Sequence, residues 1–286
     1  MDSHSEKEPK LRWDYRDLPW DAIDRGAMAD RQLLFYMLAV ASVIEITSDI
    51  YTGNLVEYFD GDEDVGGWLA NAWEPEELQH GAALKRYVQA VWPGFDWDDA
   101  YRRFHEDYVT YCQVEYLGPT RALEMARRCV VETGTCSYYA MINRAAPCPV
   151  LRKLAENIRN DEANHYRHFY DYFRRYRALE KPPRRSVLKA LVDKSVEING
   201  EDGLIAFRHV WQQMNPGRTF RKREYRRFER AVLGLAQRNY PFRLAANMGT
   251  RPLDLPLLAQ QCTDATLAGA GRAAARVTGR AAATID

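Results

Sequence analysis

The chain has 286 residues, enough for one large domain or two small ones with a well-buried core. Hydrophobic residues make up 46% and charged residues 28% of the sequence, as in ordinary globular proteins. Basic and acidic side chains number 40 each, so the overall charge favours neither a nucleic-acid-binding protein nor a membrane-surface protein. No apolar stretch is long enough to span a bilayer, and residues 1–10 lack the apolar centre of a secretory signal. We therefore expect a cytoplasmic protein that does not bind a membrane.

The sequence predicts an all-α protein, because no segment alternates polar and apolar residues as a strand does. Residues 1–26 read as an N-terminal arm with Trp13, Tyr15 and Trp20 as aromatic anchors. Helical patterns follow over residues 27–59, 67–91, 97–112, 118–144 and 149–177. We expect a four-helix bundle within residues 27–180.

After the bundle, the sequence predicts a helical extension over residues 184–250. Asn199-Gly200 and Asn215-Pro216-Gly217 are breaks within it. Residues 262–286, rich in Ala, Gly, Arg and Thr, are expected to form a flexible tail, with an isolated Ala-rich helix as the alternative. The five cysteines are scattered and form no C-x-x-C pair, so we expect buried, reduced thiols rather than disulfides or structural zinc.

Two of the predicted helices carry a Glu-x-x-His motif, Glu77 to His80 and Glu162 to His165. Residues three apart on a helix share a face, so each motif offers a carboxylate and an imidazole to one metal ion. Two such motifs, with one glutamate from each of two further helices, form the ligand set of a di-iron carboxylate bundle. The sequence therefore predicts a carboxylate-bridged di-iron centre, with these ligands: Glu45, Glu77, His80, Glu132, Glu162 and His165.

Each of these glutamates replaces an apolar residue in the inward stripe of its helix. In the last bundle helix, for example, Glu162 and His165 lie between Ile158 and Phe169 at steps of three and four residues. Burying unpaired carboxylates is very unfavourable, and four in one core would repel one another. Two divalent cations balance the four charges, and oxygen and nitrogen ligands suit iron or manganese.

Several segments resemble the soluble acyl-carrier-protein desaturases. Residues 73–81, WEPEELQHG, look like their W-x-x-E-E-N-R-H-G segment, and residues 161–165, DEANH, resemble their D-E-K-R-H segment. Glu45, followed by a Tyr six residues later and a Leu ten residues later, resembles their first ligand helix. Glu132 to Thr135 resembles their E-x-x-T. The resemblance covers roughly residues 30 to 175.

The resemblance implies a ferritin-like homodimer whose two Fe ions, ferrous when reduced, activate O2. The implied reaction is desaturation or hydroxylation at an unactivated C–H bond of an acyl chain carried as an acyl-carrier-protein thioester. A ferredoxin or a similar donor would supply the electrons. Thr135 would assist oxygen activation, and Asp161 would orient a histidine ligand.

The sequence departs from the desaturase pattern at Pro75, which would kink or restart the second helix, and at Leu78 and Gln79, which replace a polar and a basic residue. These departures leave open an N-oxygenase or an enzyme that cleaves C–C bonds of an amino-acid-derived substrate. An iron-storage or ferroxidase protein is the alternative from another class. Ribonucleotide reductase small subunits fit less well, because they usually begin their ligand set with Asp. Three tyrosines near the ligands are expected to pack in the core: Tyr51, Tyr138 and Tyr139.

Two stretches are locally basic, residues 174–189 and residues 218–230. Acyl carrier proteins and ferredoxins are acidic, and a basic face would steer either one. A solvated helix surface is an equally good interpretation of both stretches.

Overall fold

The computed structural model of the protein describes residues 11–198 and 202–279. All regular structure in these ranges is helical, which confirms the predicted all-α class. The first helices are α1 Arg25–Met28, α2 Gln32–Glu45, α3 Ser48–Tyr58, α4 Glu63–Trp68, α5 Glu74–Val91 and α6 Trp97–Tyr108. They are followed by α7 Arg121–Ala145, α8 Pro149–Glu180, α9 Arg184–Ile198, α10 Asp202–Met214, α11 Lys222–Asn239, α12 Phe242–Thr250 and α13 Leu257–Gly279.

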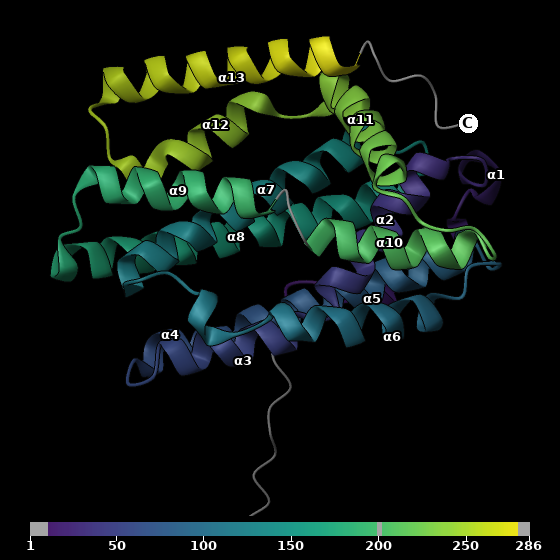
Figure 1. The fold of residues 1–286 in the computed structure, drawn as a ribbon, viewed down its shortest axis with the longest axis horizontal. Coiled ribbons are helices and arrows are strands. Elements are labelled where there is room, and N and C mark those ends of the chain that lie inside the picture. The colour runs from purple at the N-terminus through teal and green to yellow at the C-terminus, as the bar shows by residue number, and fades with distance from the viewer. Residues whose placement is uncertain (1–10, 199–201, 280–286) are drawn as a thin grey trace, which may run out of the picture.

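The long helices pack as pairs (Figure 1). Helix α7 lies along α8, α2 lies on α5, and α5 also contacts α8. The later helices cover this group: α9, α11 and α12 contact α7, whereas α10 lies against α2 and α6. The cysteines are all free, but Cys262 is exposed, contrary to the expectation that the thiols are buried.

The predicted helix over residues 27–59 is in fact two helices, α2 and α3, which are bent by 42° relative to each other. Two hydroxyls near the break bond to helix carbonyls: Thr47 Oγ1 donates to Ile44 O (2.6 Å) and Ser48 Oγ to Glu45 O (2.7 Å). Such bonds compete with the backbone pattern and bend helices. No single helix in the described ranges is long and apolar enough to span a membrane, although α2 and α3 taken together meet that test of length and composition.

The second predicted helix begins earlier than residue 67 and is continuous through a π-helical turn, Leu69–Trp73, which joins α4 to α5. Pro75 lies in the first turn of α5, where its missing N–H costs little. The break expected at Pro75 is therefore this π-turn rather than a gap between helices.

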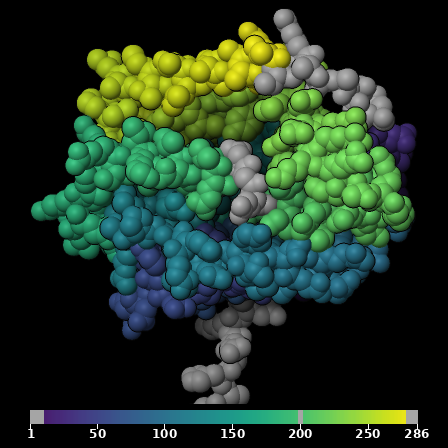
Figure 2. Space-filling model, in the orientation of Figure 1, coloured from purple at the N-terminus to yellow at the C-terminus, as the bar shows by residue number. Residues whose placement is uncertain are grey.

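The flexible tail predicted over residues 262–286 is wrong as far as residue 279, because helix α13 occupies that segment. Its small residues allow it to lie close to its neighbours. Ala268 and Ala275 are buried, and a Cβ on Gly271 would lie 2.8 Å from the Phe242 ring. Figure 2 shows α13 (yellow) along one edge of the molecule. Residues 280–286 lie outside the described ranges.

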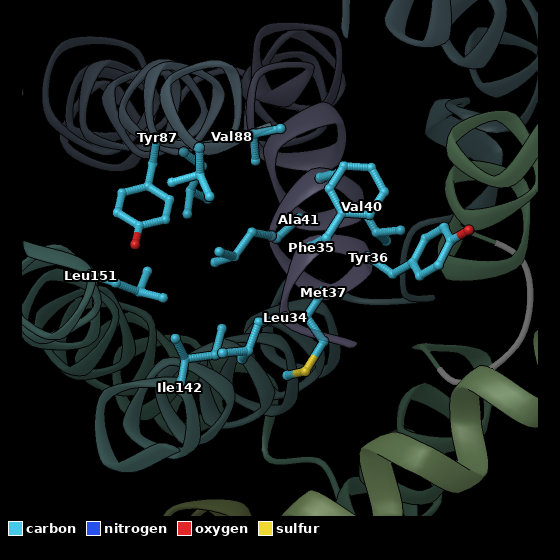
Figure 3. Close-up of a cluster of buried hydrophobic side chains, with 14 of the residues drawn as sticks. Leu34, Phe35, Tyr36, Met37, Val40, Ala41, Tyr87, Val88, Ile142 and Leu151 are labelled. Carbon is cyan, nitrogen blue, oxygen red and sulfur yellow. The ribbon is translucent and has the colours of Figure 1, made fainter. Parts of the chain in front are cut away.

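Two apolar clusters fill the interior, and each draws on several helices. Figure 3 shows part of the first cluster, with side chains from four helices facing one another: Leu34, Ala41, Tyr87, Val88, Ile142 and Leu151. In α8, Ile158 belongs to the first cluster and Phe169 to the second. The predicted ligands of α8 fall between these two residues, so the polar cluster lies where one apolar cluster ends and the other begins.

Candidate metal centre

The six predicted metal ligands lie together in the protein interior, and none is more than 7% exposed. They come from four helices: Glu45 from α2, Glu77 and His80 from α5, Glu132 from α7, and Glu162 and His165 from α8. The tertiary structure thus brings together side chains that are up to 120 residues apart, counted from Glu45 to His165.

The ligand atoms form two overlapping groups, in each of which they lie within 4.8 Å of one another. One group contains Glu45, Glu77, His80 and Glu162, and the other contains Glu77, Glu132, Glu162 and His165. Because Glu77 and Glu162 belong to both groups, they are placed to bridge two neighbouring metal positions. The arrangement can hold metal ions, and neither group contains a cysteine.

The unsatisfied polar atoms of the cluster fit a bound cation. Four of them are buried without a hydrogen-bond partner: His80 Nδ1, His165 Nδ1, Glu132 Oε2 and Glu162 Oε1. His165 Nδ1 lies 3.0 Å from Glu77 Oε1, but the contact lacks hydrogen-bond geometry. Each buried, unpaired group costs about 1–3 kcal/mol. Cations between these atoms would satisfy all of them at once.

The opposite nitrogen of each histidine contacts a carboxylate outside the cluster. His80 Nε2 lies 3.1 Å from Asp161 Oδ2, and His165 Nε2 lies 2.7 Å from Glu76 Oε2. Such contacts fix the ring and its tautomer, so that Nδ1 keeps a lone pair for a metal ion. Asp161 contacts a histidine as expected, whereas the contact of Glu76 with His165 was not predicted. The available signal was an acidic residue directly before the glutamate of each motif.

The N-terminal arm covers these outer carboxylates. Trp13 Nε1 donates to Asp161 Oδ2 (2.6 Å), and its ring stacks with His80 at a centroid distance of 6.3 Å. Arg12 Nε lies 3.6 Å from Glu76 Oε1. The described part of the arm is therefore a structural part of the candidate metal centre.

Two hydroxyls on α7 contact the ligands directly. Thr135 Oγ1 donates to Glu162 Oε2 (2.6 Å), so the predicted threonine lies beside a shared carboxylate. Tyr139 donates to Glu45 Oε1 (2.5 Å), which adds a polar role to the core packing expected of it. Tyr138 donates instead to Met37 O, and Tyr51 lies under the Arg128 guanidinium.

A glycine brings the first two ligand helices together. A Cβ on Gly81 would lie 2.5 Å from the backbone nitrogen of Ile46. Any larger residue would separate α5 from the end of α2, where Glu45 and His80 approach each other. The glycine at the end of the WEPEELQHG segment is therefore needed for the close packing of α5 against the end of α2.

The metal-free cluster holds protons. Burial raises the pKa of Glu45 and of Glu132, and the neighbouring carboxylates of Glu77 and Glu162 raise both further. Burial alone would lower the pKa of His80 and His165, but the surrounding carboxylates outweigh it and raise both values well above the usual one. Cations that bind here must displace protons.

No family model, no curated protein and no solved structure matches this chain.

Proposed function

We propose that the protein is an O2-dependent non-haem di-iron oxidase that acts on an unactivated C–H bond. The observation that supports this proposal most strongly is the buried ligand set with its two shared glutamates. Four carboxylates and two imidazoles match the ligand set of the di-iron carboxylate bundles. Oxygen and nitrogen donors without a thiolate also suit iron.

Two bound ferrous ions would pass electrons to O2, which is the oxidant in the attack on a C–H bond, and a ferredoxin-type donor would restore the ferrous state. The side chains of this protein would bind and orient these ions. Glu77 and Glu162 would bridge them, and Glu76 and Asp161 would keep the histidine Nδ1 atoms unprotonated. Thr135, which already donates to Glu162 Oε2, is placed to deliver a proton beside the shared carboxylate.

The substrate in this proposal is an acyl chain held as an acyl-carrier-protein thioester, and the reaction is desaturation or hydroxylation. The basic surface of residues 218–230 supports an acidic partner, whether the carrier protein or a ferredoxin-type electron donor. Its seven basic side chains are exposed: Arg218, Arg221, Lys222, Arg223, Arg226, Arg227 and Arg230. In the described ranges, only Arg223 and Arg227 of these form an ion pair within 4.0 Å, both with Glu224.

The basic stretch of residues 174–189 is a weaker candidate for docking, because several of its charges are used within the protein. Arg175 pairs with Asp62 and Asp64, and Lys189 pairs with Asp193. A partner would have to compete with these pairs.

The test is to load the protein with Fe2+, admit O2 and supply acyl-carrier-protein thioesters together with a reduced ferredoxin. We expect an unsaturated or hydroxylated acyl product and O2 consumption that depends on the thioester. Glu77→Ala is the control, since Glu77 serves both metal groups and its loss should abolish metal retention and turnover together. Iron uptake without product from any thioester would reject the acyl substrate, and absence of bound iron would reject the di-iron centre.

A further inference from the structure

The two ends of the ligand cluster differ in how their outer glutamate is held. At one end, Tyr139 is 1% exposed and donates a hydrogen bond to Glu45 Oε1. The other oxygen of this carboxylate, Oε2, lies 3.9 Å from His80 Nδ1. The two oxygens of Glu45 therefore have separate roles, because one is bonded to a tyrosine and the other faces the metal position.

At the opposite end, Glu132 Oε2 is buried without a hydrogen-bond partner and lies 3.7 Å from His165 Nδ1. Glu132 Oε2 is thus available to a cation without the loss of a hydrogen bond. A cation that drew both oxygens of Glu45 toward itself would first have to break the bond from Tyr139. Breaking a hydrogen bond to a buried carboxylate is costly.

We infer that Tyr139 is a positioning residue that presents only Oε2 of Glu45 to the metal position shared with His80. This position consequently binds a divalent cation more weakly than the position formed with Glu132 and His165. The inference rests on the proposed metal-binding function. It adds the order in which the two metal positions fill and the residue that controls this order. The two metal positions fill in sequence, and the Glu45 position fills last.

Tyr138 provides a matched control. It is the next residue on α7, its ring contacts that of Tyr139, and its hydroxyl is also hydrogen-bonded, but to the backbone oxygen of Met37. Tyr138→Phe and Tyr139→Phe each delete one hydroxyl from the same helix. A purely structural role would make the two variants behave alike.

The experiment titrates metal-free protein with Co2+, whose visible absorption reports coordination and which does not need O2 to be excluded. Wild type should bind two Co2+ in two steps of unequal affinity, and Glu45→Ala should remove only the weaker step. Tyr139→Phe should tighten that same step by about 10- to 100-fold and change its absorption, because both oxygens of Glu45 then become free to bind the cation without the loss of a hydrogen bond. The tighter step should remain unchanged, and Tyr138→Phe should match wild type in both steps.

Urea unfolding of the metal-free variants serves as the folding control, and both tyrosine variants should show similar midpoints. Two equal steps in wild type would overturn the inference, and so would a Tyr139→Phe variant in which the weaker step is unchanged or becomes weaker still. These outcomes leave metal binding itself intact. A wild-type protein that binds no Co2+ would instead overturn the metal centre, and this inference with it.

Discussion

Asp161 offers the sharpest test of the metal centre, because its Oδ2 contacts both Trp13 Nε1 and His80 Nε2. Asp161→Leu keeps a side chain of similar size but removes this oxygen, so His80 Nε2 loses its carboxylate partner. The imidazole is then no longer held with its proton on Nε2, and Nδ1, which is the atom that faces the cluster, can carry the proton instead.

The expected effect follows from this change of tautomer. Loss of a partner that orients a metal-bound histidine typically costs 10- to 100-fold in affinity, or about 1.4–2.7 kcal/mol. We expect Asp161→Leu to reach the upper part of this range. Trp13→Phe removes one hydrogen bond and leaves the carboxylate on His80, so it should cost about 10-fold or less.

The assay is competition for Co2+ between the protein and a chelator of known affinity. Glu156→Gln, an exposed change on the same helix, is the matched control and should bind like wild type. If Asp161→Leu retains wild-type affinity, then Asp161 does not set the protonation of His80, and the metal-ligand role of His80 Nδ1 loses its support.

Three further predictions concern protons, packing and partner binding. The pKa values of Glu45 and His80 are raised in the metal-free protein, so Co2+ binding should release protons, and the affinity for Co2+ should increase from about pH 6 to about pH 8. A Co2+ affinity that does not vary with pH in a chelator competition would contradict this prediction. Gly81→Ala should destabilise the metal-free protein by about 1–3 kcal/mol in urea unfolding, since its Cβ meets the Ile46 backbone. Gly53→Ala, with open space around its Cβ, should stabilise it by about 0.5–1 kcal/mol, and equal effects of the two changes would contradict the close approach. Charge reversal of exposed Arg226 to Glu should weaken carrier-protein binding and lower its salt dependence; unchanged binding would remove the surface of residues 218–230 as the docking site.

The buried cluster of Glu and His side chains was predictable from the sequence because it depends on helix periodicity. Glu162 and His165 share a face on any helix, and their place within an apolar stripe directs that face inward whatever the surrounding fold. The burial of charge in that stripe then requires compensation, and the second Glu-x-x-His motif indicates that bound cations provide it. The all-α class followed from the same periodic patterns.

Other features depended on contacts between distant segments. The pairing of Glu76 with His165 and the cover of Trp13 over Asp161 both join residues whose proximity no local pattern encodes. Helix α13 was only the alternative to a flexible tail for a related reason. Its Ala- and Gly-rich sequence carries a weak apolar signal, and only the fit against Phe242 and the neighbouring helices gives it a buried face.

The sequence by itself determined which side chains can bind a metal ion, since ligand chemistry and helical spacing are local properties. The tertiary structure decided how each ligand is held. Glu45 and Glu132 have the same side chain, but Glu45 is the last residue of α2 and Glu132 lies in the middle of α7. In the described ranges, only Glu45 of these two accepts a hydrogen bond from a tyrosine hydroxyl. The difference between the two ends of the cluster comes from the place where α7 meets α2, because a hydrogen bond between helices depends on which side chains come together there.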